Sequence, residues 1–144
     1  MSTNEGYRYE ELSVGMSHED EHVITERDVE LFAEVSGDRN PLHMDEEFAK
    51  TTIFGQRIAH GALTASFISG ALGNHLPGPG SVFTGLSMRF RRPVPIGSTV
   101  VARVEIIEMQ PRGNRVTLKV SCSVNGKPAV SGEANVVVPS RESE

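Results

Sequence analysis

The sequence has very little cysteine, no tryptophan, no long apolar run and no excess of positive charge. Its single cysteine, Cys122, excludes an internal disulfide and any cysteine-rich zinc site. No stretch approaches the roughly 20 apolar residues of a membrane helix, and the first residues lack the apolar segment of a signal peptide. The net charge of −5 argues against nucleic acid as the partner. We therefore expect a cytoplasmic protein that binds neither membranes nor nucleic acid.

The 144 residues are enough for one domain, 1–144, with a core over about 8–139 and flexible ends. In the first half, TERDVELFAEVSG predicts a helix that Thr25 caps and Gly37 ends. DEEFAK indicates a second, short helix, and the polar MSHEDEHVI is a candidate first strand. The predicted apolar face of the first helix consists of Val29, Leu31, Phe32 and Val35.

Residues 61–73, GALTASFISGALG, are apolar almost all round and rich in small side chains, which predicts a helix buried on every side. The second half changes to a period of two, in SVFTGLSMRF, VARVEI, RVTLKVSCSVNG and PAVSGEANVVV. In the first of these strands the pattern places Val82, Leu86, Met88 and Phe90 on one face. The pair Asn125-Gly126 is a strong hairpin signal.

These elements predict an α+β protein in which one curled antiparallel sheet wraps around a buried helix, the hot-dog fold. A sheet that is half covered and has a free edge strand invites pairing with another copy. We therefore expect a symmetric homodimer, or a dimer of dimers.

The segment SGDRNPLH, residues 36–43, brings an acid and a histidine into one turn. Because Pro41 prevents a regular helix between Asp38 and His43, a rigid loop would have to bring their side chains together as an acid/base pair. Asn40 can bond neighbouring backbone groups within that loop. Composition alone equally allows an ordinary turn after a helix, with Asp38 as a cap and His43 exposed.

The segment RIAHGALTAS places Gly61 at the start of the predicted buried helix. Helix N-termini present unpaired N–H groups, so the Gly61 N–H is a candidate oxyanion donor, although a glycine used only for chain entry is the simpler reading. His60 is better explained as a structural residue than as a catalytic one. A buried serine such as Ser69 usually just bonds a backbone carbonyl.

The cluster RFRRP supplies Arg89, Arg91 and Arg92, whose guanidinium groups suit phosphates, although a solvated strand end explains them equally well. His18 and His22 lie in a charged segment that we expect to be exposed, and no spacing in the chain is convincing for a metal site. Cys122 falls on the apolar face of its strand and is expected in the core.

Taken together, GDRNPLH, the following HG and the small-residue helix resemble the MaoC-like dehydratases, the (R)-specific enoyl-CoA hydratases of hot-dog fold. The resemblance covers roughly residues 15–138. It implies reversible addition of water to a trans-2-enoyl thioester, with no metal and no organic cofactor. By this resemblance Asp38 and His43 hold the water and move its protons, and Asn40 supports loop and water. The Gly61 N–H polarises the thioester carbonyl.

The resemblance also implies that Ser69 lies near the acid/base pair or shapes the acyl pocket. Arg89, Arg91 and Arg92 are candidates to bind the phosphates of an acyl-CoA substrate. Three other functions remain open from the sequence: a dehydratase that uses an acyl-carrier protein, a thioesterase, and a non-catalytic acyl-CoA binding protein. The intact acid/base pair argues against the last of these, and the GDxNPxH loop argues against the thioesterase.

Overall fold

A computed structural model describes residues 5–141 of the chain. Two short segments precede the first long helix: the 3₁₀ turn Tyr9–Glu11 and strand β1. Three helices then lead into the long helix α4, and four strands complete the chain. The bounds are β1 Ser17–Val23, α1 Glu26–Ser36, α2 Pro41–Met44, α3 Glu46–Lys50, α4 Gly61–Asn74, β2 Val82–Phe90, β3 Thr99–Gln110, β4 Arg115–Val124 and β5 Lys127–Val137.

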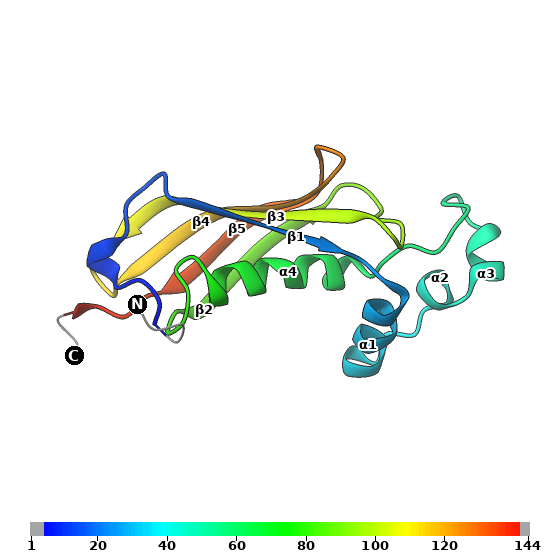
Figure 1. The fold of residues 1–144 in the computed structure, drawn as a ribbon, viewed down its shortest axis with the longest axis horizontal. Helices are drawn as coiled ribbons and strands as arrows, with labels where there is room; N and C mark the ends of the chain where they lie inside the picture. Colours follow the sequence, from blue (N-terminus) through cyan, green and yellow to red (C-terminus); the bar gives the residue numbers. More distant parts are fainter. Residues whose placement is uncertain (1–4, 142–144) are drawn as a thin grey trace.

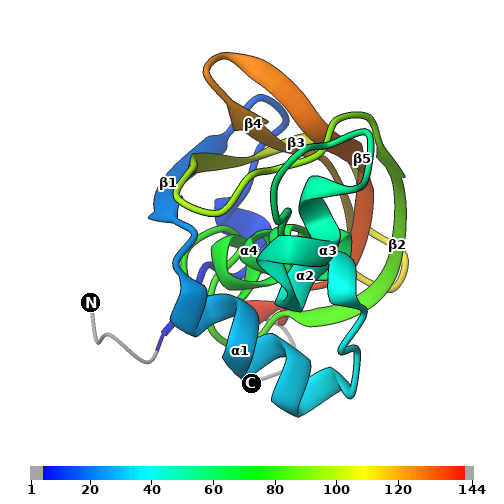
Figure 2. The ribbon, with the colours of Figure 1, turned by 90° about the vertical axis from the view of Figure 1, so that its right-hand side faces the viewer.

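The strands form one antiparallel sheet in the order β1-β3-β4-β5-β2. The sheet curls around α4, from β1 on one side to β2 on the other (Figure 2). Helices α1, α2 and α3 lie beyond the N-terminal end of α4 (Figure 1). This is the predicted α+β hot-dog fold, and it places the loop between α1 and α2 next to the start of the central helix.

The core forms between the concave face of the sheet and α4 because the long strands alternate strictly. In β3, Val100, Ala102, Val104 and Ile106 are buried, and β4 contributes Val116, Leu118, Val120 and Cys122 in the same way. The β4–β5 turn has positive φ at both Asn125 (52°) and Gly126 (77°), which is the pattern of a type I′ turn. The predicted alternation and the predicted hairpin are thus confirmed.

The prediction that the central helix is buried on every side is wrong for a single chain. One face of α4 packs into the sheet, through Leu63, Thr64, Ile68, Ala71 and Leu72. The opposite face, with Ala62, Ser66 and Ser69, is exposed. The sequence pattern could not reveal this difference, because small residues suit contact with a second chain as well as contact within one.

The apolar face predicted for α1 is only partly correct. Val29 and Ala33 are buried, but Leu31 is 42% and Val35 87% exposed. The helix lies beyond the sheet (Figure 1). It packs through a single stripe of residues four apart, so its other apolar side chains stay in solvent. Its ends are as predicted, with Thr25 as N-cap and Gly37 in the left-handed region at φ 80°.

Strand β2 contains an irregularity that the sequence pattern did not show. Its pairing with β5 shifts register between Phe83 and Gly85. The extra residue changes which side chains face α4. Phe83 lines the hollow beside the helix together with Leu86, Met88 and Phe90, whereas Val82 does not.

The flexibility of the ends stays a prediction, although the described parts of both ends make hydrogen bonds. The Tyr7 N–H donates to the carbonyl of Pro77 at 2.9 Å, and the Ser140 hydroxyl donates to Glu10 at 2.7 Å. The prediction for residues 1–4 and 142–144 falls outside the described residues. Among residues 5–141, no helix is long and apolar enough to span a membrane.

Candidate active site

The loop after α1 is built from side chains that cap backbone groups. The carboxylate of Asp38 accepts a hydrogen bond from the Asn40 N–H at 3.1 Å, and the Asn40 side chain accepts from the Leu42 N–H at 3.0 Å. Asn40 is the N-cap of α2, and Pro41 is the first residue of that helix. No regular helix joins Asp38 to His43, as expected, but Pro41 begins the short helix α2, because proline is well tolerated at the first helical position, where its missing N–H has no partner to lose.

His43 lies on α2 and is 9% exposed, so the alternative with an exposed His43 is wrong. Its Nδ1 lies 2.8 Å from the carbonyl oxygen of Ile58. A carbonyl can only accept, so Nδ1 carries the proton and Nε2 keeps its lone pair. The fold therefore fixes the orientation of the His43 ring and leaves Nε2 as the nitrogen that is available to a substrate.

His60, the residue before α4, contacts the loop through its side chain. It is 1% exposed, and its Nε2–H donates to the carbonyl of Asp38 at 2.9 Å. Its ring lies 4.2 Å from the ring of His43 and 4.9 Å from that of Phe32. Nδ1 of His60 has no hydrogen-bond partner among the described residues. This agrees with the structural role that the sequence favoured for His60.

One carboxylate oxygen of Asp38 and one ring nitrogen each of His43 and His60 lie within 4.8 Å of one another. The fold thus brings the predicted acid/base pair together. Side chains of these types can transfer protons, and they can also bind a metal ion.

A cavity of about 300 Å³ opens beside this group. His43, Gly61, Thr64, Phe90, Arg91 and Arg92 are among its lining residues. Asp38 is exposed and does not line the cavity itself. The acid/base pair therefore sits at the edge of the cavity, with the Asp38 side open to solvent in a single chain.

Gly61 is the first residue of α4, and its N–H makes no hydrogen bond to any described residue. The first backbone bond within the helix runs from Thr64 to the carbonyl of His60. A Cβ at position 61 would lie 2.8 Å from Cε1 of Phe90, so only glycine fits this approach without displacing the ring. The free N–H and the positive end of the helix dipole are thus available to an oxygen atom in the cavity.

The three arginines of the RFRRP cluster separate in the structure. Arg91 and Arg92 line the cavity of His43 and Gly61, and Arg89 does not. Arg91 donates to Ser131 Oγ at 2.6 Å, and Arg92 donates to the Pro128 carbonyl at 2.6 Å. Both guanidinium groups are therefore held in place while keeping further N–H groups free.

Ser69 is not brought to the acid/base pair. It lies on the exposed face of α4 and lines a second, apolar hollow of about 420 Å³. Phe90 lines both spaces. The large apolar side chains of α4, Leu63, Phe67 and Leu72, line neither space and pack in or against the core instead.

Sequence reasoning missed the groups that fix the loop. Arg57 Nε donates to the carbonyl of His43 at 2.7 Å, and Nη1 of the same residue pairs with Glu26 at 2.9 Å. The carbonyls of Ile58 and Asp38 are backbone groups, which no residue pattern could single out. Cys122 is buried as predicted, and burial raises the pKa of its thiol to about 12, which leaves it unreactive.

Comparison with known proteins extends this description. Residues 11–127 match the family model described as the MaoC like domain. The chain is 45% identical to the (R)-specific enoyl-CoA hydratase of Rhodospirillum rubrum over 133 residues, which is 92% of each chain. It is 46% identical to the 3-hydroxybutyryl-CoA dehydratase of Methylorubrum extorquens, over 93% of this chain and 85% of that protein. The solved (R)-hydratase of A. caviae superimposes with a TM-score of 0.87 at 41% identity, over 89% of this chain and 98% of that one.

Burial of His60 generates a prediction about pH. Burial lowers the pKa of His60, the hydrogen bond to the Asp38 carbonyl opposes this shift, and the charge of His43 adds to it. The unfolded chain therefore binds the proton more readily than the folded chain. This contribution to stability is complete above the unfolded pKa of about 6.5 and is lost as pH falls toward the lowered folded pKa.

In His60→Gln, the side-chain amide replaces the N–H donor but does not titrate. We expect its thermal midpoint to fall less than that of the wild type between pH 7.5 and pH 5.5, as measured by circular dichroism. Equal losses in the two proteins would show that His60 does not titrate on unfolding.

Proposed function

Because the chain belongs to the MaoC-like dehydratase family, we propose that it is an (R)-specific enoyl-CoA hydratase. It adds water to a trans-2-enoyl-CoA to give an (R)-3-hydroxyacyl-CoA, and it catalyses the reverse dehydration. The observation that carries this proposal is the orientation of His43. Its Nδ1 bonds to the Ile58 carbonyl, which leaves Nε2 for the reaction, and a ring nitrogen of His43 lies within 4.8 Å of an Asp38 carboxylate oxygen.

In this mechanism one water molecule lies between Asp38 and His43. As the water oxygen attacks C3 of the enoyl group, one of its protons passes to the pair, and the pair delivers a proton to C2. The hydroxyl group and the hydrogen added to the substrate thus both derive from water. The two groups share the protons and are treated as one acid/base system.

The negative charge that develops on the thioester oxygen is stabilised by the N–H of Gly61. Because this N–H has no partner among residues 5–141 and lies at the positive end of α4, it is ready for the oxygen before the reaction starts. One such donor typically lowers the barrier by about 3 kcal/mol. Proton transfers and this donor suffice, so we propose that no metal or organic cofactor takes part. The cytoplasmic location remains a prediction from the sequence.

We expect Asp38→Asn and His43→Gln each to lower kcat for crotonyl-CoA hydration by about 10²–10⁴-fold, because each removes a proton-transferring group while keeping its shape. The loss of the enoyl absorbance measures the rate, and chiral analysis identifies the product. Unaltered rates in both variants would contradict the assignment of the pair. A wild type that releases free thiol would instead indicate a thioesterase.

A second candidate substrate is the thioester of an acyl-carrier protein. A mitochondrial 3-hydroxyacyl-[acyl-carrier-protein] dehydratase of Arabidopsis thaliana is 33% identical over 132 residues. The relatives named for CoA thioesters have higher identity, which favours CoA. Parallel assays with the same acyl group on CoA and on carrier protein distinguish the two, and a wild type that binds both without turnover would support the non-catalytic alternative.

We propose that Arg91 and Arg92 bind the phosphates of CoA, because both line the cavity that contains His43 and Gly61. Replacing either by Ala should raise KM for crotonyl-CoA about 10-fold with little change in kcat, since a charge-assisted hydrogen bond is worth about 1.5–3 kcal/mol. Arg89→Ala is the matched control, because Arg89 comes from the same cluster but lies outside that cavity. Equal effects of all three changes would indicate a general effect of charge.

We further propose that two chains pair along β2 to form a homodimer. This strand is a free edge of the sheet, and it carries apolar side chains that are 41–59% exposed in a single chain: Val82, Phe83, Leu86 and Phe90. The exposed small face of α4 borders the same surface. A second copy would cover both and close the open side of Asp38.

The expected outcome of Leu86→Arg is a folded monomer with reduced turnover, because a buried charge at the centre of the interface is costly. Light scattering after size-exclusion chromatography measures the mass and separates a dimer from a dimer of dimers. Val14→Arg is the control, since Val14 is also exposed (63%) but precedes β1, at the opposite edge of the sheet. A Leu86→Arg protein with the wild-type mass would contradict this interface.

A further inference from the structure

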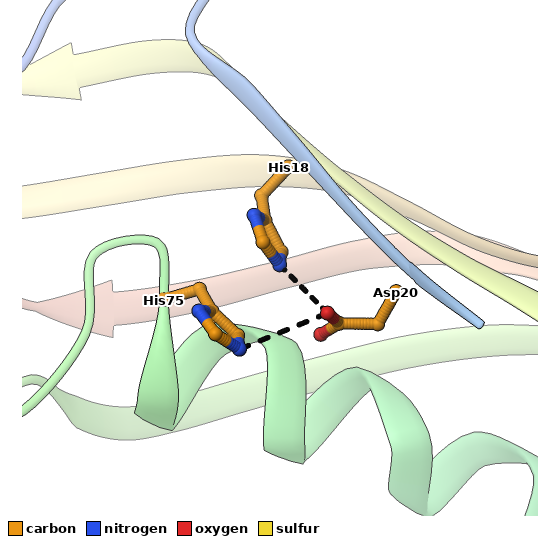
Figure 3. A group of neighbouring side chains, drawn as sticks. All are labelled: His18, Asp20 and His75. Atoms are coloured by element: carbon orange, nitrogen blue, oxygen red, sulfur yellow. Dashed lines mark hydrogen bonds and ion pairs between the residues drawn. The ribbon is translucent and has the colours of Figure 1, made fainter. Parts of the chain in front are cut away.

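A second cluster of metal-binding side chains lies at the opposite end of α4 from Gly61. His18 and Asp20 come from β1, and His75 follows the last residue of α4 (Figure 3). His18 and Asp20 are two residues apart on a strand, so their side chains share the face that looks toward the helix. Fifty-five positions separate Asp20 from His75, which is why no spacing in the sequence suggested the group.

The distances in this cluster are close to those between the ligands of a metal ion. Nε2 of His18 lies 2.9 Å from Oδ1 of Asp20, and Nε2 of His75 lies 3.7 Å from the same oxygen. All three ligand atoms lie within 4.8 Å of one another. Ligands of a tetrahedral zinc ion, at about 2.0–2.1 Å from the metal, are about 3.3 Å apart. Both distances to Asp20 are therefore within a few tenths of an ångström of that separation.

The imidazoles of His18 and His75 both direct Nε2 toward Oδ1 of Asp20 (Figure 3). Their ring centroids are 4.1 Å apart and the ring planes differ by 19°. A metal lies close to the plane of each imidazole that binds it, so the rings have to open into a fan when an ion enters. His75 is 48% exposed and is free to make that rotation.

The surroundings favour a cation. His75 is the C-cap of a 14-residue helix, and the C-terminal end of a helix carries a partial negative charge. The side chains of His18, Asp20 and His75 are 29%, 39% and 48% exposed, which leaves an entry path and room for a water ligand. His22, the next histidine on the same face of β1, is occupied by its contacts with Asp28 and Phe67.

From these contacts we propose that His18, Asp20 and His75 bind a divalent cation of the zinc class, with water in the remaining position. Two imidazoles and one carboxylate suit zinc, cobalt or nickel, whereas magnesium and calcium prefer oxygen ligands. The ion replaces the proton that His18 now shares with Asp20. It joins the edge strand β1 to the end of α4, about 20 Å along the helix from Gly61. The site is therefore structural, and it raises stability without entering the reaction.

Titration calorimetry and thermal melting with Zn²⁺ test the proposal. We expect the wild type to bind one Zn²⁺ per chain and to melt at a higher temperature with it, and Mg²⁺ to do neither. Asp20→Asn and His75→Ala should each weaken Zn²⁺ binding by at least about 10-fold and remove the thermal shift. Hydration activity of metal-free His75→Ala should equal that of the metal-free wild type.

Two controls separate this site from other histidines. His22→Ala should bind Zn²⁺ as the wild type does, because His22 lies on the same strand outside the cluster. Asp38→Asn should also bind normally, since the catalytic loop holds a separate group of ligands. Wild-type binding by His75→Ala, or loss of binding in Asp38→Asn alone, would overturn the proposal. So would a wild type that binds no Zn²⁺.

Discussion

Two hydrogen bonds from histidine side chains to backbone carbonyls hold the active loop against the start of α4. His43 donates to the carbonyl of Ile58, and His60 donates to the carbonyl of Asp38. The segment around residues 38–43 and the segment just before α4 therefore each donate one hydrogen bond to the other. Both imidazoles are buried, where an unpaired polar group is costly, and the pairings are therefore strongly favoured. The bond from His43 to Ile58 also determines which ring nitrogen of His43 is left for the substrate. The position of the loop and the orientation of the His43 ring thus depend on the same pair of bonds.

One face of the central helix belongs to the core, and the opposite face belongs to the surface. Its sheet-facing side is fully buried, whereas its opposite side carries small residues next to the apolar side chains of β2. In a monomer, the hollow there would expose a contiguous apolar surface. A second copy explains why residues such as Ala62 and Ser69 are small, because small side chains let another backbone approach closely.

Much of the fold could be predicted from the sequence because local chemistry specified it. Strict alternation fixed the inward faces of β3 and β4, Thr25 and Gly37 fixed the ends of α1, and Asn125-Gly126 fixed the last hairpin. The failures occurred where tertiary position decides. Val35 is apolar but lies on a helix beyond the sheet, and the bulge in β2 exchanged Val82 for Phe83.

The sequence could predict which residues form the site, but not which groups position them. The GDRNPLH motif singled out Asp38 and His43, but the groups that aim them are the carbonyl of Ile58 and the side chain of Arg57. Likewise, the three arginines of the RFRRP cluster looked equivalent in the sequence. In the structure, Arg89 lies within β2, whereas Arg91 and Arg92 follow the end of that strand and line the cavity. Backbone acceptors and strand ends leave no mark in residue type, so they require the structure.

The two ends of α4 have opposite electrostatic requirements, and the polarity of one helix meets both. A hydration reaction develops negative charge on the thioester oxygen, and the N-terminal end of a helix favours negative charge. The C-terminal end favours a cation, and there the structure places two imidazoles and a carboxylate. A reversed helix would oppose the reaction at one end and repel the cation at the other. The direction of α4 along the sheet thus suits both the proposed reaction and the proposed cation site.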